Sequence, residues 1–352
     1  AEQAAEVDPI PGLREVRLTS LTLDEARHLG ASRVLEGVTA LELSDPLDGD
    51  GVRALFDGAR LEDLRSLGLY GSLHPSGWDA LLRLPLPSLE RLVVRSTALT
   101  EDARRFAAWP SLGNVRVLSL EGHVGEAVEV LWGSPNLASL RHLRLDLCSV
   151  ERFPSDLGTS RIHLESLSLP SFADRADLVA DLVQASSLES LRSLSVFGIA
   201  GSATTHEVLA GLAEGGALRR LQRLAVDGPG PLAAMLAHIG DGTPARLHTL
   251  ELAATHSRAK LDRAIKRLFD SPCHRLLRAL RLRTDHGPHP VALSVVESIL
   301  ACPRLELLDV GVGWRRSARR VALGNHPVVQ RLLASGGLTE EAFGRTSSRT
   351  AA

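Results

Sequence analysis

Leucine and valine recur along this chain in short groups that share one internal spacing. The segment LREVRL at Leu13 returns as VTALEL at Val38, LRSLGL at Leu64 and LERLVV at Leu89. Eight further copies begin at Val115, Leu140, Leu164, Leu191, Leu221, Leu247, Leu277 and Leu305. In the twelve copies, spaced 24 to 30 residues apart, all 36 first, fourth and sixth positions are Leu or Val. Self-similarity at such a period is typical of a solenoid of stacked repeats.

Each copy predicts a short strand. The fourth and sixth positions differ by two residues, so their side chains point to the same face of a strand, and the first position anchors the turn that precedes it. Successive strands can pair only with their neighbours in the array, which predicts parallel pairing and one continuous aliphatic core.

Helical spacing marks several of the segments that connect the strands. Val52, Leu55 and Phe56 share one helical face, and similar groups occur at 261–269 and 293–300. Thr100, followed by two acidic residues, predicts a helix N-cap. The pattern therefore predicts helices that return the chain from the end of one strand to the start of the next.

The pattern resembles the leucine-rich-repeat family over residues 13–320, and the repeat lengths resemble its ribonuclease-inhibitor-like class. The resemblance implies an α/β horseshoe with about twelve parallel strands on its concave face and helices or irregular turns on its convex face. One feature departs from the family, whose motif continues to an Asn or Cys three residues after the sixth position. Only Cys148 matches that position strictly, so we expect irregular turns.

The repeats divide the chain into three parts. Residues 1–12 are a lead-in that we expect to be truncated, 13–320 form the repeat domain, and 321–352 form a helical cap with a frayed tail. Within the cap, Pro327 is expected near the start of a helix that Gly336 and Gly337 end. The short lead-in cannot cover a repeat edge, so we expect an upstream domain or a second chain to cover it.

Composition and charge narrow the class of protein. Hydrophobic residues make up 44% of the chain but aromatics only 3%, so the core must pack through aliphatic side chains. A formal net charge of −2 argues against a dedicated nucleic-acid or membrane-surface protein, although the acidic residues gather towards the start and the basic residues towards the end.

Cysteine and lysine usage suggests a location. Three widely separated cysteines favour a reducing compartment over a disulfide framework. The chain has no stretch that resembles a signal peptide or a membrane span. Only two lysines accompany 38 arginines, which we attribute to a GC-rich bacterial genome. We therefore expect a cytoplasmic bacterial protein.

A search for catalytic motifs gives no candidate. The sequence lacks a phosphate-binding loop, a nucleophile elbow and a metalloprotease histidine pair. His286 and His289 form a pair without a third ligand nearby. Trp78, Trp109 and Trp132 each precede a strand and are interpreted as packing residues. We expect no enzyme activity, no cofactor and no metal.

The candidate site lies on the concave face, where the third, fifth and seventh positions of each copy form columns. The residues chosen there combine Tyr and Arg, types enriched at interface hot spots, with a histidine and a further aromatic. They are Tyr70, Arg91, Arg95, His142, Arg144 and Phe197. In a simpler interpretation, Arg95 only pairs with Glu121 on the next strand.

Three functions remain open from the sequence. The leading hypothesis is a non-catalytic protein–protein interaction scaffold, the sensor or substrate-recruiting part of a larger bacterial assembly. A second is the repeat-bearing part of an enzyme, such as a protease or a ubiquitin-ligase-like effector, whose catalytic part lies elsewhere. The third is nucleic-acid binding through the basic C-terminal region, which includes Arg315 and Arg316. That region lacks the interleaved aromatic residues that nucleic-acid binding favours.

Overall fold

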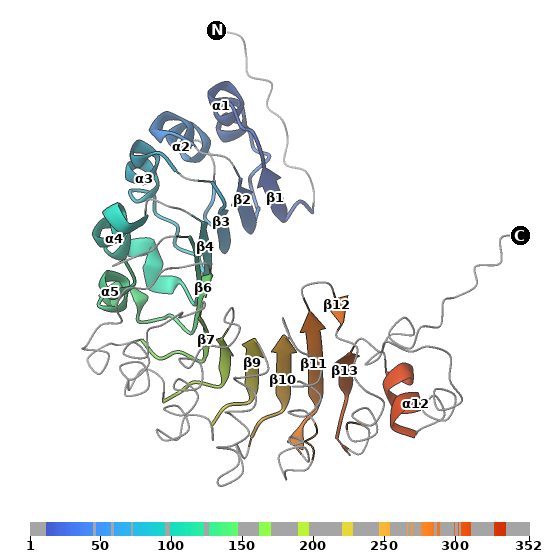
Figure 1. Cartoon of the computed structure of the whole chain (residues 1–352). Coiled ribbons are helices and arrows are strands. Elements are labelled where there is room, and N and C mark those ends of the chain that lie inside the picture. The colour runs from blue at the N-terminus through green and yellow to red at the C-terminus, as the bar shows by residue number, and fades with distance from the viewer. Residues whose placement is uncertain are drawn as a thin grey trace, which may run out of the picture. The chain divides into compact units, whose positions relative to one another are not determined.

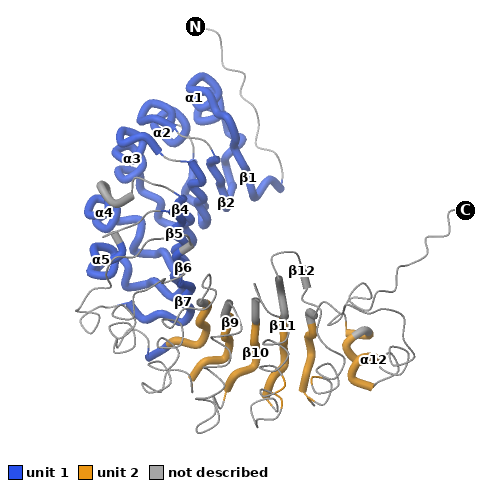
Figure 2. Tube along the Cα trace, viewed as in Figure 1, with its two compact units in different colours: residues 1–170, 184–190 blue, residues 171–183, 191–352 orange. Residues whose placement is uncertain are grey.

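The computed structural model describes part of the chain and separates it into two compact units. The described residues are 12–44, 47–57, 60–71, 73–95, 99–122, 127–146, 162–169, 189–196, 220–227, 246–253, 266, 269, 276–284, 287–288, 299, 302, 304–310 and 327–335. Unit 1 comprises Ala1–Pro170 and Gln184–Ser190, and unit 2 comprises Ser171–Val183 and Leu191–Ala352 (Figure 2).

Seven parallel strands pair in chain order in unit 1. They are β1 (Glu15–Leu18), β2 (Ala40–Leu43), β3 (Ser66–Leu69), β4 (Arg91–Arg95), β5 (Val117–Glu121), β6 (His142–Asp146) and β7 (Ser166–Leu169). The register joins equivalent positions of the repeat, so Leu67 lies beside Leu92 and Leu92 beside Leu118. Because no register shift accumulates, each position of the repeat forms a straight row across these strands.

Unit 2 contains five parallel strands of the same kind, also paired in chain order. They are β8 (Ser193–Val196), β9 (Arg223–Asp227), β10 (Thr249–Ala253), β11 (Ala279–Thr284) and β13 (Leu307–Val310). The seven strands of unit 1 and these five are the twelve predicted strands, so the α/β class and the parallel order are confirmed. The two-residue β12 (Gly287–Pro288) pairs antiparallel with β11 and lies outside the repeat pattern, which did not predict it.

A shared backbone carbonyl marks the start of most strands. The carbonyl of Arg65 accepts hydrogen bonds from the amides of Glu90 and Arg91, at 2.9 and 2.8 Å. In unit 2 the carbonyl of Arg192 accepts in the same way from Gln222 and Arg223, at 2.7 and 3.0 Å. The second residue of a copy thus binds the second and third residues of the next, which fixes the register before the strand begins.

The core is built from the first, fourth and sixth positions, as predicted. The fourth-position Leu41, Leu67, Leu92, Leu194 and Leu250 are fully buried in their own units. In the first described copy, by contrast, Leu13, Val16 and Leu18 are only partly buried. That copy is an edge of the array, and the expectation that another domain or chain covers it stays a prediction.

Five helices of the described residues return the chain between the strands of unit 1 and lie on one side of them (Figure 1). They are α1 (Leu23–Ala31), α2 (Gly49–Phe56), α3 (Pro75–Leu81), α4 (Leu99–Ala107) and α5 (Ala127–Trp132), with 3₁₀ turns at Pro110–Asn114 and Pro135–Leu137. Val52, Leu55 and Phe56 are buried, which confirms the predicted apolar face of α2. Neighbouring helices approach closely: a Cβ on Gly30 would lie 2.0 Å from the carbonyl oxygen of Ala54, so this contact between α1 and α2 needs glycine.

The predicted N-cap at Thr100 is wrong. Helix α4 begins at Leu99, so Thr100 lies inside its first turn rather than before it. An N-cap preference amounts to about 1 kcal/mol, which is too little to set a boundary against the packing of the whole helix. The capping pattern therefore located a helix here but misplaced its first residue by two positions.

The predicted packing role of the tryptophans is confirmed. Trp78 and Trp109 are each 1% exposed, and Trp132 is also buried. Phe106 of α4 lies between the first two, with ring centroids 5.9 Å from Trp78 and 6.3 Å from Trp109. The indole Nε1 of Trp109 donates to the carbonyl of Leu84 at 3.1 Å. With Phe56 of α2, these rings are the buried aromatic side chains among the described residues of unit 1.

The predicted C-terminal helix is present as α12 (Pro327–Ala334), with Pro327 at its first position. Val329 and Leu332 are fully buried, and Arg331 donates to the carbonyl of Leu305 at 2.8 Å. The helix therefore contacts the segment that leads into β13, and its role as a cap of the repeats stays a prediction. No described helix has the length and apolar character needed to cross a bilayer.

Candidate functional site

The solvent-facing side of the unit 1 strands carries straight rows of side chains. One row runs through Ser66, Arg91, Val117 and His142. Another runs through Gly68, Val93, Ser119 and Arg144. Adjacent strands lie about 4.8 Å apart, so the rows hold their side chains at fixed intervals. We call this side of β1 to β7 the strand face.

The structure places five of the six predicted site residues on the strand face, in two groups. Tyr70 directly follows β3 and is partly buried, while Arg91 and Arg95 are the exposed first and last residues of β4. His142 and Arg144 are exposed on β6, separated from β4 by β5. The sixth residue, Phe197, lies outside the described residues.

Arg95 makes the predicted cross-strand ion pair. Its Nε lies 3.5 Å from Oε2 of Glu121, which is the neighbouring residue in register on β5. The simpler interpretation of Arg95 is therefore confirmed as a contact. A solvated pair of this kind adds little stability, on the order of 0 to 1 kcal/mol, so the arginine can still reach a partner.

Tyr70 is held in a defined position by its neighbours. Its hydroxyl lies 3.5 Å from Oε1 of Glu42, and Glu42 is ion-paired with Arg17 on β1. The ring lies over Gly68, because a Cβ built there would meet Cε2 of Tyr70 at 2.8 Å and Cγ of Glu42 at 3.3 Å. A glycine inside a strand often marks a close approach by another group, and here that group is the tyrosine ring.

Sequence reasoning missed Gly68. Gly68 adds no side chain to its column, although a strand-interior glycine two residues before the chain's only tyrosine indicates a close approach by another group. Glu42 is not among the predicted site residues either, because its contact with Tyr70 depends on the three-dimensional register.

The surroundings of Tyr70 raise the pKa of its phenol. Burial is the main cause, and the negative charges of Glu42 and Glu121 add to it, while Arg91 and Arg17 act in the opposite direction. Four charged side chains from β1, β2, β4 and β5 therefore lie within electrostatic reach of one ring. The phenol stays neutral and available as a hydrogen-bond donor throughout the physiological pH range.

Replacing Glu42 by Gln should lower the pKa of Tyr70, because the substitution removes a negative charge that disfavours the phenolate. The chain has a single tyrosine, so the phenolate absorbance during an alkaline titration reports this residue alone. The unfolded chain provides the reference value of about 10. A titration identical in the folded parent, the E42Q variant and the unfolded chain would show that Tyr70 does not lie in this environment.

Replacing Gly68 by Ala should displace the Tyr70 ring from its position over residue 68. The displaced phenol is more exposed to water, so its pKa should fall. The ring is the movable end of a side chain, so stability should change by less than about 1 kcal/mol. Gly113→Ala is the matched control, because a Cβ there meets nothing within 4 Å. If the pKa of Tyr70 is the same in the two alanine variants, its ring does not lie over Gly68.

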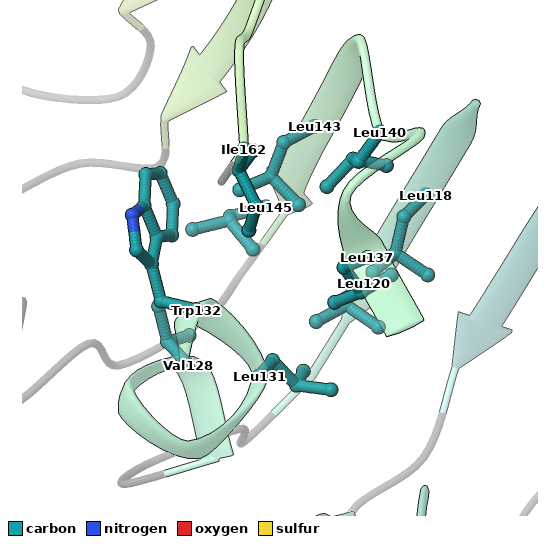
Figure 3. A pocket seen from close by; sticks show the side chains of 10 residues that line it. All are labelled: Leu118, Leu120, Val128, Leu131, Trp132, Leu137, Leu140, Leu143, Leu145 and Ile162. Atoms are coloured by element: carbon teal, nitrogen blue, oxygen red, sulfur yellow. The ribbon is translucent and has the colours of Figure 1, made fainter. Parts of the chain in front are cut away.

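A small apolar cavity lies in the core of unit 1 between β5, β6 and α5 (Figure 3). Its volume is about 10 Å³, which is room for roughly one water molecule. Ten apolar or aromatic side chains line it, among them Leu120, Leu131 and Leu143. An apolar space of this size stays dry and is a packing space rather than a ligand site.

The described residues show no cluster of three or more His, Cys, Asp or Glu side chains placed to hold a metal ion. His286 and His289 lie outside the described residues, as do Cys148 and Cys273. Cys302 is buried, its Sγ donates to the carbonyl of Leu277 at 3.3 Å, and burial raises the pKa of its thiol. This cysteine therefore joins two repeats and is poorly placed for nucleophilic chemistry.

The fold and the strand face together define a parallel-stranded repeat protein with a mixed-charge surface around one tyrosine. Compared with protein-family models and with curated proteins, the chain has no match. The function is therefore argued from the geometry of the strand face.

Proposed function

We propose that this chain is a non-catalytic protein–protein interaction scaffold of the leucine-rich-repeat kind, in its ribonuclease-inhibitor-like class. The twelve in-register repeats and the helical returns of unit 1 support this assignment. In such an array each strand presents its third, fifth and seventh residues as part of one extended surface. We propose that it serves a cytoplasmic bacterial assembly as the sensor or substrate-recruiting part.

The observation that carries the proposal is the fixed position of Tyr70 beside Arg91 and Arg95. The ring lies on Gly68 and its hydroxyl faces Glu42, so the side chain loses little further freedom when a partner docks. Tyrosine and arginine dominate the energetics of many interfaces, and both types stand here on paired parallel strands. The strand face of unit 1 is therefore the proposed binding surface.

Affinity capture from the source cell with three parallel baits tests this proposal. The baits are the parent chain, a strand-face variant (Tyr70→Ala with Arg95→Ala) and a helix-face variant (Arg53→Ala with Arg104→Ala). Arg53 and Arg104 are exposed on α2 and α4, so the second variant is a matched surface change. We expect one or more proteins to be retained by the parent and the helix-face variant and lost from the strand-face variant. Identical proteins on all three baits would contradict the proposal, as would catalytic turnover by the purified chain.

A further inference from the structure

In the ion pairs on the strand face, the carboxylate is the more buried partner and the guanidinium group is the more exposed one. Glu42 and Glu121 are each 21% exposed, whereas their partners Arg17 and Arg95 are 66% and 56% exposed. A count of charges along these strands gives nearly equal numbers of each sign. The structure separates them by depth, so the outer layer of this mixed surface is basic.

The ion pairs of the unit 1 helices show no common order, so the layering does not follow from arginine's length alone. Between α3 and α4, Asp79 is 42% exposed and its partner Arg105 50%. On α1, Asp24 is 82% exposed and its partner Arg27 60%. On α2, Asp50 is 67% exposed and its partner Arg53 50%. A partner that approaches the helices therefore meets acids and bases equally, while one that approaches the strand face meets arginines first.

Further positive groups extend this outer layer. Arg91 is exposed, and no carboxylate of the described residues is within ion-pairing distance of it. Arg144 is exposed two strands further on, beside the exposed imidazole of His142. Glu15, at the edge on β1, is an exposed carboxylate of the strand face. Tyr70 lies between the arginines of β1 and β4, within electrostatic reach of both.

Unit 2, taken by itself, repeats the layering. Glu251 on β10 is 14% exposed and lies 3.2 Å from a guanidinium nitrogen of Arg223 and 3.8 Å from one of Arg281. The two arginines come from the neighbouring strands β9 and β11. The same arrangement, a largely buried carboxylate paired with more exposed arginines, thus occurs independently in another part of the chain.

We propose that the strand face of unit 1 binds an acidic segment of a protein partner, with the partner's carboxylates on Arg91, Arg95 and Arg144 and an apolar side chain against the Tyr70 ring. This inference rests on the proposed function and specifies its partner. Planar guanidinium groups suit carboxylates, and complementary charge speeds association and selects the partner. Nucleic acid is disfavoured as the partner because glutamates lie directly beneath the arginines and the whole chain carries a formal charge of −2, which would repel phosphates. Tyr70 is also the chain's one tyrosine, whereas single-stranded nucleic acid stacks its bases on several aromatic side chains.

Binding of a fluorescent oligoglutamate, followed by anisotropy at low ionic strength, tests the inference. We expect the parent chain to bind this probe and to lose affinity as salt is added. The triple variant Arg91→Ala, Arg95→Ala, Arg144→Ala should bind about tenfold more weakly. Lysine at the same three positions keeps the charge and should restore most of the binding, which separates a charge effect from misfolding. Arg27→Ala, Arg53→Ala, Arg104→Ala removes the same net charge from the helices and should leave binding unchanged.

Three results would overturn the inference. An equal loss in the helix variant would mean that the probe senses net charge alone. Tighter binding of an oligothymidylate than of oligoglutamate, with the same dependence on the three arginines, would make the face a nucleic-acid interface. If the captured partner depends on Tyr70 and Arg95 but is neither displaced by oligoglutamate nor weakened by salt, the acidic segment is wrong while the protein-binding function stands.

Discussion

Phe106→Ala is expected to lower the free energy of unfolding of unit 1 by about 3 to 5 kcal/mol, the range for removing a buried aromatic ring. Phe106 is fully buried and its ring touches both Trp78 and Trp109, so the substitution leaves a cavity and removes two aromatic contacts at once. Denaturant unfolding followed by tryptophan fluorescence measures the effect, because two of the four tryptophans lie against the deleted ring.

Arg104→Ala is the matched control on the same helix. Arg104 is exposed on α4 two residues before Phe106, so its removal should change stability by less than about 0.5 kcal/mol. If the two variants unfold at the same denaturant concentration, Phe106 does not pack in the core and the placement of α4 against the strands is wrong.

The strands were predictable because the leucine and valine pattern that produces them recurs at regular intervals along the chain. Leu67, Leu92 and Leu118 occupy the same position in successive copies, and the register pairs them directly. Parallel order follows from repetition itself, since each strand has only its neighbours to pair with. The start of α4 was not predictable, because the helix begins at Leu99 rather than directly after Thr100 and the difference depends on packing.

The candidate site was predictable only as a set of columns. The sequence placed Tyr70, Arg91, Arg95, His142 and Arg144 on one face, and the structure confirms this placement for all five. It could not show that Tyr70 lies on Gly68 or that Glu42 and Glu121 lie below their arginines. Ring orientation and charge depth depend on contacts between residues about one repeat apart, which residue types alone do not determine.

The double substitution Tyr70→Ala, Arg95→Ala is expected to weaken binding of the captured partner by more than about thirtyfold. Truncating a central interface anchor typically costs at least about 2 kcal/mol, which corresponds to that factor. The loss should appear mainly as faster dissociation, because affinity differences at one interface lie mostly in that rate. Surface plasmon resonance with the purified partner measures both rates.

Folding should survive this double substitution, because neither side chain belongs to the leucine core. The helix-face variant Arg53→Ala, Arg104→Ala is the control and should bind within about twofold of the parent, as peripheral charges outside an interface contribute little. Unchanged affinity in the strand-face variant would place the binding site on another surface.

The most direct measurement of the central claim is a crosslinking map made with a photoreactive amino acid placed singly at Val117 or at Arg104. Val117 is partly exposed on the strand face between Arg91 and His142, and Arg104 is exposed on α4, so the two positions sample different surfaces. The claim that the chain recognises a protein through its strand face predicts that the partner crosslinks from position 117, on an acidic peptide, and not from position 104. Crosslinking from position 104 with none from position 117 would contradict it.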